Sequence, residues 1–262
     1  MTEIVLIGMN FKLNTGLTDG YKSNSQKIRV MTEAWVADNV FCPVCGNSHV
    51  SHLSNNMPVA DFVCPHCCEN FELKSKSSTI SNKITDGAYS TMIERINSIS
   101  NPELFVMQYS KDLEVVNLTL IPKFFFVPSI IEKRKPLSEN ARRAGWTGCN
   151  ILLSKVPEQA KITIIKNQIC TEVDLVVGQY AKLRQLQTNN IKGRGWLMDI
   201  LNCVNGIKSA DFFLEDIYGF ESQLKLKHPD NYHIQAKIRQ QLQLLRDKGF
   251  IEFLGNGHYR KI

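Results

Sequence analysis

The sequence predicts an α/β protein with two domains, a larger one built on a mixed sheet and a smaller, mainly helical one. Three observations predict this class. The chain has 262 residues, enough for two ordinary domains. Helix-like and strand-like segments are mixed up to about residue 188, with several strands in succession, and helical patterns dominate afterwards. With 43% apolar and 21% charged residues, the composition is globular and excludes a wholly disordered chain.

The first predicted element is a helix over residues 23–39. Apolar residues recur there at helical spacing, at Ile28, Met31 and Trp35. Ser23, followed three residues later by Gln26, has the pattern of a capping box at a helix start. We therefore expect an amphipathic helix that begins at Ser23.

A second helix and three strands complete the larger domain. The helix is expected over about 87–99, and the strands over 104–109, 115–126 and 161–166. Consecutive strands without helices between them favour a mixed sheet over a purely parallel one.

A polar, glycine-containing stretch at 187–195 marks the expected domain boundary, which gives domains of residues 1–188 and 189–262. Helices are expected over 196–204, 211–224 and 233–248. Two short apolar strands then surround the turn Gly255-Asn256-Gly257. Three helices followed by such a hairpin predict a winged helix-turn-helix.

The chain shows no sign of a membrane or secretory protein. No apolar run approaches the roughly 20 residues that cross a bilayer. The N-terminus has an acidic residue and no basic start before its short apolar stretch, unlike a signal peptide. We expect a cytoplasmic protein that does not associate with membranes, in which cysteines bind metal or lie buried rather than form disulfides.

Two cysteine pairs have the spacing of a zinc site. Cys42-Pro-Val-Cys45 and Cys64-Pro-His-Cys67 are separated by 18 residues, within the range of a four-cysteine zinc site. Four thiolates fill the tetrahedral shell of Zn²⁺ and leave no position for substrate. The sequence therefore predicts a structural zinc bound by Cys42, Cys45, Cys64 and Cys67. The remaining cysteines have no such pattern, and we expect buried free thiols at Cys68, Cys149, Cys170 and Cys203.

The second cysteine pair lies between two segments that carry candidate catalytic residues. Asp61 follows Pro58, and Glu72 and Lys74 share one face of a strand in which apolar and charged residues alternate. If the segments pair as a hairpin, Asp61 lies opposite that face. Two carboxylates can bind Mg²⁺, and a lysine beside them can orient or deprotonate the attacking water. A solvated Glu-Lys ion pair on an exposed strand is the alternative.

Two further regions suit contact with DNA. Arg142 and Arg143 precede Gly145-Trp146, so that cations lie beside an indole that can face a base or a methyl group. The alternative places the arginines in solvent and Trp146 in the core. Polar residues crowd the third C-terminal helix, at Tyr232, His233, Gln235, Lys237, Arg239, Gln240 and Gln243. This face is a candidate for the DNA major groove, although winged helices also bind proteins.

Several segments together resemble one enzyme family, the DpnI-type methylation-dependent restriction endonucleases. They span most of the chain in the same order: Tyr21-Lys-Ser-Asn-Ser-Gln-Lys27, Pro58-Val-Ala-Asp61, Phe71-Glu-Leu-Lys-Ser-Lys76, Asp86-Gly-Ala-Tyr89, Ala141-Arg-Arg-Ala-Gly-Trp-Thr-Gly-Cys-Asn150, Arg239-Gln-Gln-Leu-Gln243 and Arg246-Asp-Lys-Gly249. The resemblance implies a catalytic domain of the PD-(D/E)XK restriction-endonuclease type, followed by a winged helix. It also implies a bacterial, monomeric type II enzyme that cuts double-stranded DNA at GATC sites with 6-methylated adenine.

The resemblance further implies roles for individual residues. Asp61 and Glu72 would bind Mg²⁺, and Lys74 would act on the water. Trp146 would contact the adenine methyl groups, and the third C-terminal helix would recognise a methylated site independently.

Two other functions remain open from the sequence alone. A nuclease of the HNH type would use His49, His52 and Asn55 between the cysteine pairs. A regulator with a zinc ribbon and a winged helix would bind DNA without cutting it.

Overall fold

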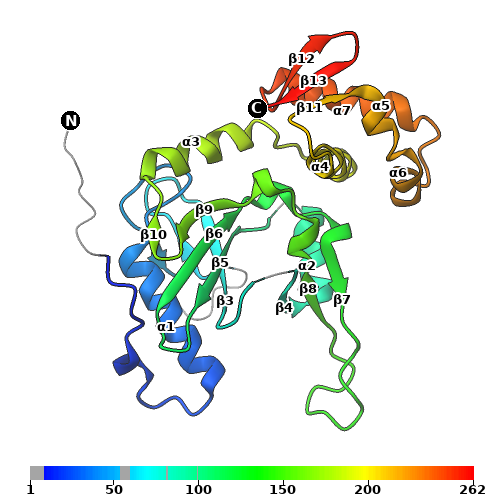
Figure 1. Ribbon diagram of the computed structural model, residues 1–262. Helices are drawn as coiled ribbons and strands as arrows, with labels where there is room; N and C mark the ends of the chain where they lie inside the picture. The colour runs from blue at the N-terminus through cyan, green and yellow to red at the C-terminus, as the bar shows by residue number, and fades with distance from the viewer. Residues whose placement is uncertain (1–8, 54–59, 81, 99) are drawn as a thin grey trace, which may run out of the picture.

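The computed structural model describes residues 9–53, 60–80, 82–98 and 100–262 (Figure 1). Its largest sheet has seven strands in the order β1-β2-β3-β5-β6-β9-β10. These are β1 (Ser51–His52), β2 (Phe62–Val63), β3 (Asn70–Lys76), β5 (Glu103–Tyr109), β6 (Val115–Ile121), β9 (Ile162–Lys166) and β10 (Ile169–Cys170). Only β3 and β5 are parallel among these neighbours. The predicted mixed α/β fold is confirmed.

A second sheet, which the sequence patterns did not predict, lies beside the first (Figure 1). Its three strands have the order β4-β8-β7, with bounds β4 (Ile84–Ala88), β7 (Ile131–Lys133) and β8 (Gly148–Ile151). The chain passes directly from β4 into α2 (Tyr89–Ser98). Between β7 and β8, a long loop of residues 134–147 projects away from the sheets.

The helix expected at 23–39 is α1 (Asn24–Asn39), and Met31 and Trp35 are buried on it. The capping box is wrong, however. Ser23 occupies the N-cap position, but its side chain caps no backbone N–H, because its hydroxyl pairs with that of Ser25 at 2.8 Å. The start of α1 therefore has no side-chain cap.

Two other expectations for the larger domain need correction. The strand expected over 115–126 ends at Ile121, because Pro122 has no N–H to continue the ladder. The expected elements also did not include α3 (Val173–Arg184), although Val176, Tyr180 and Leu183, which are buried, have the 3–4 spacing of an amphipathic helix. Single turns of 3-10 helix occur at Thr15–Thr18, Lys123–Phe125, Pro128–Ile130, Leu153–Lys155 and Glu158–Ala160.

The C-terminal region is a winged helix-turn-helix, as predicted. Its elements are α4 (Ile191–Gly206), β11 (Asp211–Phe213), α5 (Leu214–Tyr218), α6 (Glu221–Lys227), α7 (Ile234–Asp247), β12 (Ile251–Gly255) and β13 (His258–Lys261). The apolar stripe of α7 is buried, at Ile234, Ile238, Leu242 and Leu245. None of the helices in the described ranges is long and apolar enough to cross a membrane.

The single helix expected over 211–224 is wrong. Residues 211–213 pair with β13 instead, and Phe212 is buried and stacked on Tyr259. The carboxylate of Asp216 accepts the N–H of Phe213 at 2.7 Å and starts α5 only after this strand. Aromatic burial in the sheet thus prevails over the helical pattern.

Candidate active site and metal centre

The four paired cysteines converge on one point. The Sγ atoms of Cys42 and Cys67 are 3.7 Å apart and those of Cys45 and Cys64 are 3.6 Å apart, and all four lie within 4.8 Å of one another. Four sulfurs at about 2.3 Å from a tetrahedral zinc ion are separated by about 3.8 Å. The cysteine cluster therefore fits a structural zinc ion.

Backbone contacts favour the thiolate form that a metal requires. Burial opposes ionisation of Cys64, but the N–H groups of Cys67 and His66, 3.5 and 3.4 Å from its Sγ, bring the pKa of Cys64 below its ordinary value. In contrast, burial raises the pKa of Cys42. Bound zinc favours the thiolate at both positions.

The two cysteine pairs form backbone turns of the same kind. In the first, the N–H of Gly46 donates to the carbonyl of Cys42 at 2.8 Å; in the second, the N–H of Cys68 donates to the carbonyl of Cys64 at 2.9 Å. Gly46 has a φ of 78° and Cys68 a φ of 59°, so both are in the left-handed region. Cys68 thus occupies a position that favours glycine.

The expectation of four buried free thiols is wrong for Cys68, which is exposed because this turn directs its side chain to solvent. The eight cysteines, all within the described ranges, form no disulfide; Cys149 and Cys203 are buried as expected, whereas Cys170 is only half-buried.

The expected hairpin forms and fixes Asp61 beside Glu72. Strands β2 and β3 are antiparallel, with Phe62 opposite Phe71 and the second cysteine pair at the tip. The N–H of Asp61 donates to the carbonyl of Phe71 at 2.8 Å, and the N–H of Leu73 donates to Asp61 Oδ2 at 2.7 Å. The carboxylate of Asp61 is therefore held against β3 by backbone contacts. Pro58, three residues before it, lies outside the described residues.

Asp61, Glu72 and Lys74 line one cleft of about 300 Å³ between β3, β4 and α2. Two residues to which we assigned no role, Asp86 of β4 and Arg95 of α2, line it as well. Lys74 Nζ is 2.6 Å from Glu72 Oε1 and 2.6 Å from Asp86 Oδ1, and Arg95 Nη2 is 3.2 Å from Glu72 Oε2. The cleft therefore holds three carboxylates and two cations.

Burial and mutual charge set the protonation of this cluster. Burial raises the pKa of Asp61, and burial together with the charge of Asp86 keeps the pKa of Glu72 raised despite Lys74. Burial acts to lower the pKa of Lys74, but Glu72 and Asp86 outweigh it and raise that pKa. Lys74 is thus a charged ammonium, and the carboxylates lack full compensation.

Asp86 had one sequence signal that could have revealed it. Ile84 and Asp86 alternate with exposed Thr85 and Gly87 along β4, so Asp86 is on the buried side of a strand. A carboxylate there needs a partner. The Oδ2 atom of Asp86 is buried and makes no hydrogen bond with the residues that the structure describes.

The loop between β7 and β8 carries Trp146, whose ring lies against Gly148 at the start of β8. Trp146 is half-buried, and the guanidinium of Arg143 lies 4.9 Å from the indole centroid. A Cβ atom on Gly148 would be 2.9 Å from Trp146 Cη2, so only glycine permits this contact. Gly148 pairs with Ala88, which lines the cleft. Trp146 is therefore not a core residue, and Arg142 and Arg143 are both exposed.

The polar face of α7 is largely open to solvent. The exposed side chains are Tyr232, His233, Gln235, Arg239, Gln240 and Gln243, and Lys237 is half-buried. Some are braced: Arg239 Nη1 donates to the hydroxyl of Tyr218 at 2.6 Å, and Lys225 Nζ is 4.5 Å from the ring centroid of Tyr232, which is 84% exposed. The surface is available to a ligand.

The histidines between the cysteine pairs are not arranged around the cleft. His52 Nε2 lies 2.9 Å from Glu33 Oε2, and His49 Nδ1 lies 3.3 Å from the hydroxyl of Ser48. Asn55 lies outside the described residues. This pairing does not favour the HNH alternative.

Comparison with protein families agrees with the resemblance seen in the sequence. A family model described as the Dam-replacing family, DpnI, matches residues 9–189, which is more than half of the chain. A second, described as the Dam-replacing HTH domain, matches residues 192–261. The chain therefore belongs to the DpnI, or Dam-replacing, family of methylation-dependent restriction endonucleases.

Proposed function

We propose that this chain is a type II restriction endonuclease that uses Mg²⁺ to cleave double-stranded DNA at GATC sites whose adenine is methylated at N6. The observation that carries the chemistry is the single cleft that unites Asp61, Glu72 and Lys74. Membership of the DpnI family supports the choice of substrate.

Asp61 and Glu72 would hold Mg²⁺. Burial raises the pKa of both carboxylates, and Asp86 Oδ2 has no hydrogen-bond partner among the described residues, so a divalent cation would stabilise the charged forms. Mg²⁺ typically binds one or two carboxylates and completes its shell with waters and phosphate oxygens, which fits this donor set. When bound, Mg²⁺ supplies charge neutralisation at the scissile phosphate and acidifies a water.

Lys74 positions the attacking water, and Asp86 positions Lys74. Lys74 bridges Glu72 and Asp86. Once Glu72 binds the cation, Asp86 is the carboxylate that continues to hold the ammonium in the cleft. Arg95 stays paired with the other oxygen of Glu72 and limits the rotation of that side chain.

Trp146 offers an apolar wall for the adenine methyl group, with Arg142 and Arg143 at the DNA backbone. One buried methyl group contributes roughly 0.8 kcal/mol, so strong discrimination requires several such methyl groups to be buried. A second reader in the major groove is the surface formed by Tyr232 and His233, just before α7, and by the side chains of α7 at Gln235, Lys237, Arg239, Gln240 and Gln243.

We also propose the division into a catalytic domain, residues 1–188, and a winged-helix domain, residues 189–262, in a monomeric cytoplasmic enzyme. The two family matches, to 9–189 and 192–261, support the boundary.

The test is digestion of matched plasmids, methylated or unmethylated at the adenine of GATC, with and without Mg²⁺. We expect cutting only of methylated DNA and only with Mg²⁺. Lys74→Met should slow cleavage by about 10²- to 10³-fold, the usual cost of removing one charged hydrogen-bond donor from a transition state, and Asp61→Asn should abolish it. Asp112→Asn, at an exposed turn, is the matched control and should cut normally.

Other outcomes point to other functions. Equal cutting of both plasmids contradicts methyl recognition. Cleavage that survives Asp61→Asn but is abolished in His52→Ala indicates the HNH chemistry. Binding of DNA without any cutting indicates the regulator.

A further inference from the structure

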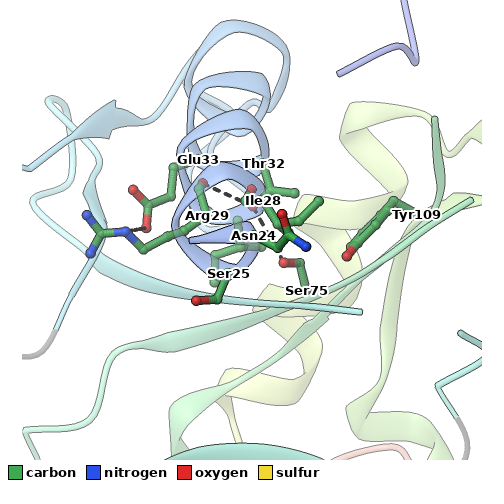
Figure 2. Close-up of a pocket in the computed structure, with 9 residues that line it drawn as sticks. Asn24, Ser25, Ile28, Arg29, Thr32, Glu33, Ser75 and Tyr109 are labelled. Carbon is green, nitrogen blue, oxygen red and sulfur yellow. Dashed lines mark hydrogen bonds and ion pairs between the residues drawn. The ribbon is translucent and has the colours of Figure 1, made fainter. Parts of the chain in front are cut away.

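A pocket lined by both polar and apolar groups lies along the first turns of α1, on the other side of β3 from the cleft. Its volume is about 400 Å³. Leu73 and Ser75 line it, whereas the intervening Glu72 and Lys74 line the cleft. Figure 2 shows the first turns of α1, with Asn24 and Ser25, facing Ser75 of β3 and the ring of Tyr109. The pocket and the cleft thus share one strand.

The N-terminus of α1 has backbone N–H groups without intrahelical acceptors. The first N–H of α1 with a helical acceptor is that of Lys27, which donates to the carbonyl of Ser23 at 3.0 Å. The preceding N–H groups, at Asn24, Ser25 and Gln26, have no intrahelical acceptor, and the Ser23 side chain does not cap them. Such N–H groups and the helix dipole favour an anion at this end.

Tyr109 gives a second, independent indication of a ligand. Its side chain lines the pocket and the residue is only 9% exposed. Among the described residues no group pairs with its hydroxyl, which opens onto the pocket instead of being enclosed in the core. Figure 2 shows this hydroxyl turned toward Ser75 and Asn24, into the pocket. A ligand with acceptor oxygens would satisfy both Tyr109 and the helix N–H groups.

The charges around the pocket also favour an anion. Lys22, Lys27 and Arg29 lie on or beside the first turns of α1. The one carboxylate that lines the pocket, Glu33, is buried and paired with Arg29 at 3.6 Å and with His52 at 2.9 Å. Arg29, which also lines the pocket, therefore offsets part of the charge of Glu33.

We infer that this pocket binds a backbone phosphate of the DNA that is cut in the cleft. The inference rests on the proposed function. Strand β2 pairs with β3 only at Phe71 and Asn70, so the following part of β3 has no strand on that side among the described residues. A DNA strand that passes this edge can reach the cleft and the pocket together. The segment Tyr21–Lys27, which belongs to the family resemblance, then has a role as a backbone anchor.

The test uses Ser25→Asp in the full-length chain. The added carboxylate stabilises α1 through the helix dipole but repels a phosphate, so stability and DNA affinity should change in opposite directions. Binding to a methylated duplex, measured with Ca²⁺ to prevent cutting, should weaken about tenfold or more. Affinity falls as salt rises, and the magnitude of the slope of log affinity against log salt concentration should become smaller by about one. This is the value for one phosphate that the protein no longer neutralises. Tyr109→Phe should weaken binding about fivefold while the protein stays folded.

Leu175→Asp is the matched control, because it places the same charge in the first turn of α3 at an exposed position. It should leave affinity and salt slope unchanged. Ser25→Asp that binds DNA like this control overturns the inference. Titration with inorganic phosphate gives a second test. If Ser25→Asp abolishes phosphate binding but leaves DNA affinity unchanged, the pocket binds free anions and the inference is overturned. If the wild-type chain binds the duplex but does not cut it, the proposed nuclease function is wrong. The comparison of DNA affinities between wild type and Ser25→Asp still tests the phosphate pocket.

Discussion

The guanidinium of Arg194, in the first turn of α4, donates a hydrogen bond from Nη1 to the carbonyl oxygen of Phe126 at 3.0 Å. Its Nη2 donates to the carbonyl of Ile96, near the end of α2, at 3.3 Å. Arg194 is 3% exposed, and burial lowers its pKa. This residue connects the region matched by the HTH model to the helix that carries Arg95 into the cleft.

We predict that Arg194→Met lowers the free energy of unfolding by about 3 kcal/mol. The substitution removes two charge-assisted hydrogen bonds and leaves two carbonyl groups without these donors. Urea unfolding measures the decrease. Lys192→Met, at an exposed position of the same helix, is the control and should change stability by less than about 0.5 kcal/mol. A decrease below about 1 kcal/mol in Arg194→Met would show that these two hydrogen bonds contribute little.

The cysteine cluster predicts different results for neighbouring cysteines. Cys42→Ser should lose bound zinc and unfold at a lower temperature, because the remaining three thiolates leave the tetrahedral shell incomplete. Cys68→Gly should retain zinc. It should also gain about 1 kcal/mol of stability, because a side chain at a φ of 59° is strained and glycine is not.

Zinc content per chain, measured with a chromogenic chelator, and thermal unfolding check both variants. Retention of zinc in Cys42→Ser, or its absence from Cys68→Gly, contradicts the assignment of the four ligands.

A buried glutamate makes stability depend on pH. Glu103 accepts hydrogen bonds from the hydroxyl of Tyr180 at 2.7 Å and the N–H of Lys123 at 3.0 Å, and burial raises its pKa from 4.5 to about 7. The folded chain thus binds this proton more tightly than the unfolded chain. The resulting stabilisation is complete below pH 4.5 and is lost as the pH rises through about 7.

Glu103→Gln removes this titration and keeps the shape of the side chain. Between about pH 5 and pH 8, we expect wild type to lose about 2 to 3 kcal/mol of unfolding free energy relative to the variant. Urea unfolding at the two pH values measures this difference. Parallel pH profiles for the two proteins would show that Glu103 keeps an ordinary pKa.

The close approach of Gly148 to Trp146 offers a test of methyl recognition that leaves the indole present. Gly148→Ala places a Cβ atom 2.9 Å from Trp146 Cη2, so the ring must move. We expect the ratio of cleavage rates on methylated and unmethylated DNA to fall about fourfold for each methyl group that the displaced ring no longer covers, following roughly 0.8 kcal/mol per methyl group. Trp146→Ala should lower the ratio at least as much.

Gly178→Ala is the matched control for this prediction. Among the described residues, no heavy atom apart from the neighbouring backbone of α3 lies within 4 Å of the added Cβ, so the variant should keep its methyl preference while its helix gains about 0.5 to 1 kcal/mol. If Gly148→Ala keeps the wild-type ratio of cleavage rates on methylated and unmethylated DNA, Trp146 does not recognise the methyl group.

Local patterns predicted the parts of the site that lie close together in the chain. The two C-x-x-C pairs predicted the cysteine cluster, because two residues between thiolates direct both sulfurs to one point. Side chains alternate between the two faces of a strand, which placed Glu72 and Lys74 on one face of β3, and the hairpin placed Asp61 beside them. Helical periodicity gave α1 and α7.

Other elements depended on competition between local preference and packing. The pattern over 211–224 is helical, but Phe212 is buried when residues 211–213 pair with β13. The pattern over 115–126 is strand-like, but Pro122 ends the ladder. Such outcomes depend on partners elsewhere in the chain, which periodicity alone does not contain.

Short segments of the sequence encode the fold class, the cysteine cluster and the family, because each depends on residues that lie close together in the chain. The tertiary structure, in contrast, brings Asp86 and Arg95 into the cleft, because β4 belongs to a separate sheet and α2 follows it. It alone placed Tyr109 opposite the uncapped start of α1. These residues are distant in sequence, and what brings them together is the burial of apolar surface over the whole domain, which no local pattern specifies.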